Sequence, residues 1–132
     1  MRWGFDHFVV RCRDVEASLE FYTTVLGFPP ERIEQWRAGK ISFPFVRVSP
    51  ATVIDLFPAP DDKDRESERQ SVDHVCLTAD KDSFEALQNR LEKAGVAILD
   101  GPAERWGAQG TAISVYFKDP DGLTIEVRTY DT

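Results

Sequence analysis

Two copies of one short pattern constrain this chain more than any other feature. The sequence DHFVV at 6–10 returns as DHVCL at 73–77, which places His7 and His74 at the same point of each copy. Each copy then runs into a helical pattern, a glycine and a short apolar strand that contains one carboxylate. Internal repetition fixes architecture and site together, because corresponding residues of a duplicated module occupy corresponding places. The chain is therefore expected to fold as two similar modules.

The two closing strands each hold one carboxylate between aliphatic residues. Asp55 lies in the run VIDL at 53–56, and Glu126 lies in TIEV at 124–127. A carboxylate in an apolar strand is costly to bury unless it is paired or bound to a cation. Taken alone, each carboxylate fits a solvent-facing position, and each histidine fits an ordinary hydrogen-bonded side chain. Two histidines and two carboxylates at matching positions instead favour a metal centre for Zn, Ni, Co, Mn or Fe.

Length and composition limit the class of protein. At 132 residues, with 42% hydrophobic and 30% charged residues, the chain has the size and composition of one soluble globular domain. Its net charge of −7 argues against nucleic acid or an anionic membrane as a partner, but leaves an anionic small molecule open. No apolar run approaches the roughly 20 residues that span a bilayer, and the start is too short and polar for a signal peptide. A cytoplasmic location is expected, with Cys12 and Cys76 as buried, reduced thiols.

The first module, at about 1–57, reads as a strand, a helix and three further strands. An alternating strand at its start places His7 and Arg11 on one face. The helix is predicted to begin after Asp14, a favourable N-cap, and to end at Gly27. The three strands that follow are predicted near 32–37, 41–48 and 52–57.

The charged segment 58–71 contains no large apolar residue and is predicted to link the modules. The second module, at about 72–132, repeats the order of the first. Its helix is predicted at 83–94, with Asp82 and Glu85 as a capping box. Its strands are predicted near 72–79, 97–99, 112–118 and 123–130.

The segment 101–110 (GPAERWGAQG) is predicted to be a long glycine-bearing loop beside the site. A large aromatic side chain next to a glycine is unusual in a simple connector, so Trp106 is a candidate lid or hydrophobic wall that contacts substrate. Cys76, two residues after His74, is expected to line the site without a redox role.

Both halves resemble the βαβββ modules of the vicinal oxygen chelate superfamily, which includes glyoxalase I, fosfomycin-resistance thiol transferases, extradiol dioxygenases and bleomycin-resistance proteins. The similarity covers essentially the whole chain and rests on His7, the segment 19–28, His74 and the run 117–122 that leads to Glu126. It implies an α+β fold of two tandem βαβββ modules that form cup-shaped sheets with helices on the outer face. It also implies a homodimer.

The resemblance to bacterial glyoxalase I also implies the ligands of one divalent metal per site: His7, Asp55, His74 and Glu126. Glu126 would be the catalytic base, and Arg11 would meet an anionic substrate such as a glutathione adduct. Arg128 is either a second substrate contact or an ion-pair partner of a carboxylate. Two departures weaken the match, because Asp55 is one methylene shorter than the corresponding glutamate and Ala59 replaces an asparagine that contacts glutathione.

Three classes of function remain open on this scaffold, which hosts unrelated activities. The favoured one is a glyoxalase I-like lyase that acts through an enediolate. The second is a metal-dependent transferase, epimerase or dioxygenase for another small molecule; fosfomycin-type enzymes would use only His7, His74 and Glu126 as ligands. The third is a metal-free binding protein of the bleomycin-resistance kind, which normally lacks the histidine and glutamate set retained here.

Overall fold

Each half of the chain folds into its own four-stranded sheet, and the computed structural model describes residues 2–65 and 72–131. The chain divides into two compact units, Met1–Ser67 and Glu68–Thr132. The elements of the first unit are β1 (His7–Cys12), α1 (Val15–Glu20), the π-helical turn η1 (Phe21–Val25), β2 (Pro30–Glu31), α2 (Ile33–Arg37), β3 (Phe45–Ser49), β4 (Thr52–Pro58) and α3 (Asp62–Arg65). Those of the second unit are β5 (Val75–Thr78), α4 (Lys81–Lys93), β6 (Asp100–Gly107), β7 (Gly110–Lys118) and β8 (Thr124–Thr129).

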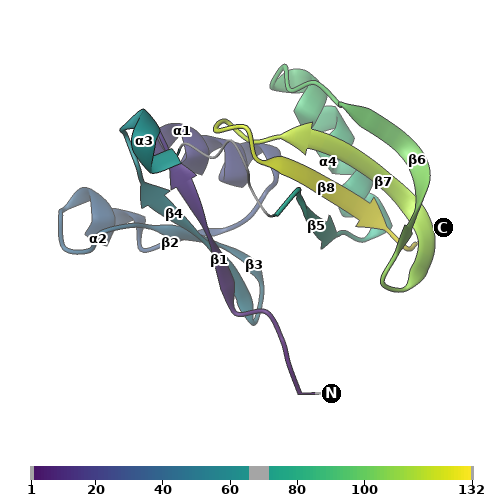
Figure 1. The fold of residues 1–132 in the computed structure, drawn as a ribbon, viewed down its shortest axis with the longest axis horizontal. Coiled ribbons are helices and arrows are strands. Elements are labelled where there is room, and N and C mark those ends of the chain that lie inside the picture. Colours follow the sequence, from purple (N-terminus) through teal and green to yellow (C-terminus); the bar gives the residue numbers. More distant parts are fainter. Residues whose placement is uncertain (1, 66–71, 132) are drawn as a thin grey trace. The chain divides into compact units, whose positions relative to one another are not determined.

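The two sheets have equivalent strand orders, β1-β4-β3-β2 and β5-β8-β7-β6 (Figure 1). In each sheet the first strand of the module pairs in parallel with the last strand, and the other neighbours are antiparallel. A parallel pair needs a crossover connection, and the intervening helix and strands supply it. The predicted α+β fold of two βαβββ modules is therefore confirmed.

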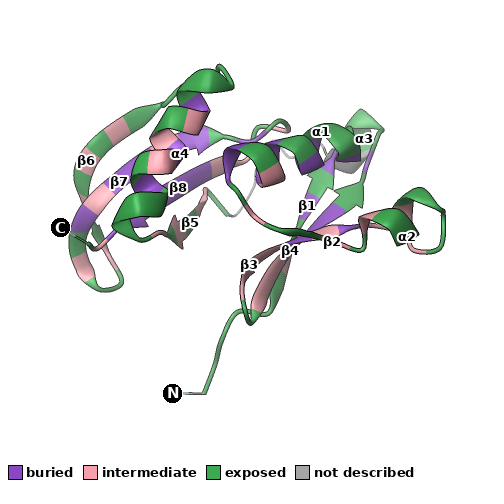
Figure 2. Ribbon diagram, turned by 180° about the vertical axis from the view of Figure 1, so that it is seen from behind, coloured by how far each residue is buried: buried purple, intermediate pink, exposed green. Residues whose placement is uncertain are grey.

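In the first unit, one face of the sheet is buried beneath α1, which packs on β4 (Figure 2). The predicted cap is confirmed, because the side chain of Asp14 accepts hydrogen bonds from the first backbone N–H groups of α1. Val10 of β1 and Leu56 of β4 are register partners on the buried face. Since side chains alternate along a strand, His7 and Asp55 belong to the opposite face.

The second unit repeats this arrangement, with α4 against β8 (Figures 1 and 2). Phe84, Leu87 and Leu91 recur at helical spacing and form the buried face of α4. On the helix-covered face, the two central strands bury Val115, Phe117, Ile125 and Val127. Glu126 alternates with these residues and therefore belongs to the other face of the sheet.

Several local predictions were wrong in ways that the structure explains. The segment near 32–37, predicted as a strand, contains the helix α2, which follows Arg32 at a positive φ of 62°. The segment 101–110, predicted as a loop, is most of β6 and the turn into β7. The helix α4 begins two residues earlier than predicted, because Asp80 rather than Asp82 caps it by accepting a hydrogen bond from the N–H of Ser83.

The predicted linker 58–71 includes the short helix α3, and its residues 66–71 lie outside the described part of the chain. None of the helices in the described ranges has the length and apolar character needed to cross a membrane.

Candidate metal centre

The first unit brings His7 and Asp55 together on the sheet face that the helix does not cover. The parallel register pairs Val9 with Asp55, so His7 lies one step away from this carboxylate on the same face. The Nε2 atom of His7 lies 3.7 Å from Oδ2 of Asp55, and its Nδ1 atom lies 2.6 Å from Oδ2 of Asp6. The contact with Asp55 is an ion-pair distance and is too long for a hydrogen bond.

The electrostatics of this pair follow from burial and from its acidic neighbour. The hydrogen bond with Asp6 raises the pKa of His7, and the charge of Asp55 raises it further. Burial raises the pKa of Asp55, and the nearby imidazole opposes that shift. Asp55 is thus a largely buried carboxylate that His7 approaches without a close contact.

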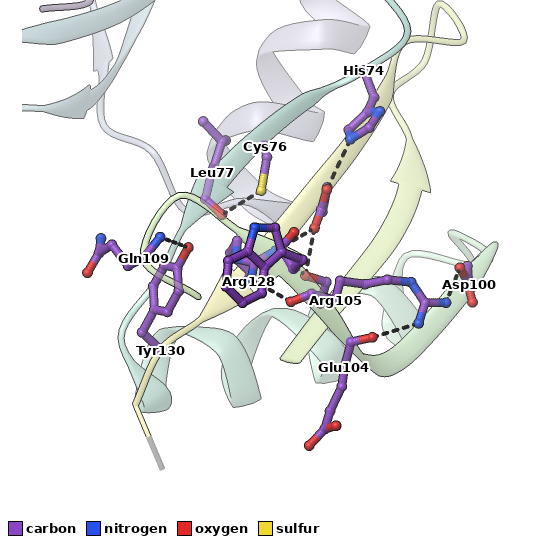
Figure 3. Close-up of polar contacts among 12 residues, drawn as sticks. His74, Cys76, Leu77, Asp100, Glu104, Arg105, Gln109, Arg128 and Tyr130 are labelled. Carbon is purple, nitrogen blue, oxygen red and sulfur yellow. Dashed lines mark hydrogen bonds and ion pairs between the residues drawn. The ribbon is translucent and has the colours of Figure 1, made fainter. Parts of the chain in front are cut away.

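The second unit brings His74 and Glu126 closer together. His74 directly precedes β5, and the parallel register pairs Cys76 of that strand with Glu126. The Nε2 atom of His74 lies 3.0 Å from Oε1 of Glu126 (Figure 3). Its Nδ1 atom lies 2.7 Å from Oδ2 of Asp73. The hydrogen bond with Asp73 and the contact with Glu126 both raise the pKa of His74.

Glu126 is buried, with only 4% of its surface exposed, and is held by neighbours on β7 and β8. Ser114 donates a hydrogen bond of 2.6 Å to Oε2, and Nη1 of Arg128 donates to the same oxygen at 3.1 Å. Burial alone would raise the pKa of Glu126. Hydrogen bonds from Ser114, Tyr116 and His74 outweigh burial and lower this pKa below its ordinary value, so Glu126 is ionised at neutral pH.

Both units share one arrangement that the sequence prediction did not include. In each unit an aspartate precedes the histidine and contacts its Nδ1 atom, which leaves Nε2 directed at the carboxylate. A partner at one ring nitrogen sets the orientation of the ring and makes the other nitrogen available to a ligand. The signal was present in the sequence, since the dipeptide Asp-His opens both modules.

The donor set fits a divalent cation. Two ligands bound at about 2.1 Å to one metal, with an angle of about 90–109° between them, lie about 3.0–3.4 Å apart. The separation of 3.0 Å between His74 Nε2 and Glu126 Oε1 falls in this range. Within residues 2–65 and 72–131, no three histidine, cysteine or acidic side chains are arranged as the ligands of one metal ion. Each unit, taken by itself, pairs one of the predicted histidines with one of the predicted carboxylates.

The three residues predicted to contact substrate differ in exposure and in the sheet face on which they lie. Arg11 is exposed on the same strand face as His7, with Phe57 as its register partner, and makes no ion pair within the described part of the chain. Arg128 is 3% exposed and paired with Glu126, which is the ion-pair alternative considered for it, so its guanidinium is not open to a substrate. Trp106 is 83% exposed, but it alternates with Arg105 along β6 and does not share the face of Glu126.

Two further side chains lie beside Glu126. Tyr116 is its register partner on β7, and the ring centroid of Tyr116 lies 5.6 Å from that of His74. Cys76 is exposed, against the prediction that it is buried. Neighbouring atoms nevertheless shield its thiol partly from water, and this partial desolvation together with the charge of Glu126 raises the pKa of Cys76 to about 11. The sequence already indicated that Cys76 lines the site, whereas only the strand register reveals Tyr116 as a neighbour of Glu126.

Comparisons with known proteins find relatives that match almost the whole chain. A family model described as Glyoxalase/Bleomycin resistance protein/Dioxygenase superfamily matches residues 4–127. Virulence protein STM3117 of Salmonella typhimurium is 30% identical over 95% of this chain and 83% of its own length. Its crystal structure matches with a TM-score of 0.71, at 27% identity, over 98% of both chains.

Two enzymes are similarly related. Metallothiol transferase FosB of Shouchella clausii is 29% identical over 96% of this chain and 80% of its own. A lactoylglutathione lyase of Neisseria meningitidis is 28% identical over 91% of this chain and 86% of its own.

Proposed function

Because this chain belongs to the Glyoxalase/Bleomycin resistance protein/Dioxygenase superfamily, we propose that it is a divalent-metal-dependent lyase of the glyoxalase I type. The observation that carries the proposal is the contact between His74 and Glu126, a nitrogen and an oxygen ligand oriented toward each other on the sheet face opposite α4. The relationship to a lactoylglutathione lyase over most of both chains supports this choice of chemistry.

The proposed ligands are His7, His74 and Glu126, with Asp55 as the weakest of the four candidates. His74 and Glu126 are already held at a suitable separation by Asp73 and by Ser114. The longer distance between His7 and Asp55 fits a carboxylate that acts through a water molecule or joins the centre only on rearrangement. A bound divalent cation would supply Lewis acidity, which polarises neighbouring substrate oxygens.

Glu126 is the proposed proton acceptor. It is ionised at neutral pH, and its Oε2 atom is occupied by Ser114 and Arg128, so Oε1 is the oxygen open to a reacting group. Oε1 would take a proton from the carbon next to a substrate carbonyl, which leaves an enediolate, and would return the proton to the adjacent carbon. Arg11 is the proposed contact for the negative charge of the substrate, because it is the exposed cation on the face of His7.

Thiol transfer to a small molecule is the second candidate function. The observation in its favour is the 3.7 Å separation of His7 and Asp55, because a three-ligand centre of His7, His74 and Glu126 needs no close fourth carboxylate. The relationship to metallothiol transferase FosB supports the same alternative.

The test is an assay of untagged protein loaded in turn with nickel, zinc, cobalt or manganese. Isomerisation of the hemithioacetal formed from methylglyoxal and glutathione should be measurable with at least one of these metals. Glu126→Gln is the matched variant, and it should abolish turnover. Absence of lyase activity with all four metals would reject the lyase and shift weight to thiol transfer, which the same protein can be assayed for with a thiol and an epoxide.

A further inference from the structure

The two carboxylate oxygens of Glu126 have different surroundings. Oε2 accepts hydrogen bonds from Ser114 at 2.6 Å and from Nη1 of Arg128 at 3.1 Å. Nη1 also lies 3.3 Å from the hydroxyl oxygen of Ser114, so the three side chains form a closed network. Oε1 faces His74 instead. The carboxylate of Glu126 is thus fixed through Oε2, while Oε1 is directed toward His74.

Arg128 connects this network to the hairpin formed by β6 and β7. Its Nη2 atom donates to the backbone carbonyls of Arg105 at 2.8 Å and Gly110 at 3.1 Å, and Nη1 lies 3.4 Å from the carbonyl of Trp106 (Figure 3). The guanidinium also lies 4.9 Å from the ring centroid of Tyr130. A planar fork of donors suits this task, because it can bind a carboxylate and several carbonyls in one fixed geometry.

Gly107 provides the space for the guanidinium. A Cβ atom added to Gly107 would lie 2.4 Å from Cζ of Arg128 and 2.6 Å from Nη2, closer than real contacts allow. The backbone of Gly107 lies outside the left-handed region, so glycine is not required there for conformational reasons. The close approach of Arg128 is the feature that a side chain at this position would disturb.

We propose that Ser114 and Arg128 are positioning residues that fix Glu126 through Oε2, so that Oε1 alone meets a cation or a reacting proton, and that Gly107 is required for this arrangement. The role given to Oε1 rests on the proposed function. The fixing of Oε2, which we call the clamp, rests on the hydrogen-bond network alone. The clamp consists of Ser114, Glu126 and Arg128 together with Gly107. It predicts that a residue without any contact to a candidate ligand, Gly107, controls the behaviour of Glu126.

A role in stability alone explains the clamp less well. A buried ion pair is commonly no more stabilising than apolar residues of the same volume, because both charges lose their hydration. Moreover, the Nε atom of Arg128 is buried and has no hydrogen-bond partner within the described residues. An unsatisfied buried donor carries a cost. The guanidinium therefore leaves its Nε without a hydrogen bond while its Nη1 keeps Oε2 of Glu126 fully hydrogen-bonded. This is expected if the role of Arg128 is to orient the carboxylate.

The test compares Gly107→Ala with Gly4→Ala, a matched control at a position where a Cβ would meet nothing within 4 Å. Hydrogen exchange of the metal-free protein reports the clamp directly. Gly107→Ala and Glu126→Gln should each speed hydrogen exchange in the β6–β7 hairpin. The double variant should exchange no faster than either single variant, because both changes remove the same interaction. Gly4→Ala should leave exchange in the hairpin unchanged. Unaltered exchange in Glu126→Gln would overturn the clamp.

Cobalt binding supplies the second readout. Gly107→Ala should weaken the affinity for Co²⁺ by about 10-fold or more and alter the visible absorption of the bound ion, as changes in residues that orient a ligand do. Wild-type affinity and an unchanged spectrum in Gly107→Ala would overturn the positioning role. Failure of the wild-type protein to bind Co²⁺, with the hairpin responding as expected, would reject the proposed metal-dependent function and leave the clamp supported.

Discussion

The Nε2 atom of His74 lies 3.0 Å from Oε1 of Glu126, and this contact distinguishes the two modules. In the first module the corresponding atoms of His7 and Asp55 are 3.7 Å apart. Glu126 is additionally held by Ser114 and Arg128. Burial alone would raise the pKa of Glu126, but hydrogen bonds from Ser114, Tyr116 and His74 lower it, whereas burial raises the pKa of Asp55. The duplicated pattern thus produces one ordered pair and one loose pair.

The first prediction concerns the relative importance of the two carboxylates for metal binding. Glu126→Gln should weaken the affinity for a divalent cation at least 10-fold more than Asp55→Asn, because Glu126 is already oriented toward its histidine. His74→Ala should match Glu126→Gln. Isothermal titration of each variant with the same metal measures the difference. Equal losses for both carboxylate variants would show that the loose pair contributes as much as the ordered one.

The second prediction concerns substrate charge. Arg11→Ala should raise the KM for an anionic substrate roughly 10-fold or more, since Arg11 is exposed and makes no ion pair within the described ranges. Thermal stability and metal content should stay close to those of the wild type. Arg37→Ala, which removes an exposed arginine paired with Glu16, is the control for loss of positive charge at the surface. A lower melting temperature with an unchanged KM would instead assign Arg11 a structural role.

The third prediction concerns Cys76, whose pKa is raised to about 11 from an ordinary value of 9.0. A raised pKa keeps the thiol neutral, so the reactive thiolate should be about 100-fold scarcer at pH 7.5 than for an ordinary cysteine. Iodoacetamide should therefore modify this exposed residue slowly, at a rate that climbs about 10-fold per pH unit until the pH approaches the pKa. Glu126→Gln should accelerate the reaction, because the carboxylate contributes to the shift. A modification rate equal to that of free cysteine would contradict the raised pKa of Cys76.

The elements that carry a strong local signal could be predicted from the sequence. The two Asp-His segments and the two apolar strands around Asp55 and Glu126 correspond to the parallel pair at one edge of each sheet. Asp14 was identified as a cap because its side chain precedes a helical pattern. These features depend on residues close in sequence, where periodicity and capping preferences act directly.

The rest depended on contacts that the sequence does not display. The strand β6 contains Gly101, Pro102 and Gly107, which are poor strand formers, and its pairing with β7 overrides that preference. Ser114 and Tyr116 become neighbours of Glu126 only through the register between β7 and β8. The sequence could not decide whether Arg128 contacts substrate or forms a buried ion pair, because a positive charge is compatible with both roles.

The fourth prediction is that the protein is a homodimer. Superfamily proteins with two short modules per chain are expected to pair and so cover the sheet faces that their helices leave open. Val9 and Phe57, on the same face as Asp55, are 48% and 41% exposed, which fits an apolar surface available for such pairing. Light scattering at micromolar concentration should give twice the 15.0 kDa of one chain. A stable species with the mass of a single chain would count decisively against the dimer.

The fifth prediction is the most direct test of the central claim, that the two histidine and carboxylate pairs serve one divalent cation. Equilibrium dialysis of untagged wild-type protein against manganese or cobalt, followed by elemental analysis, measures the number of ions per chain. One ion per chain is predicted, and His74→Ala with Glu126→Gln in the same chain should abolish binding. Two ions per chain would make each pair a separate site, and no bound ion, or full occupancy of the double variant, would contradict the proposed centre.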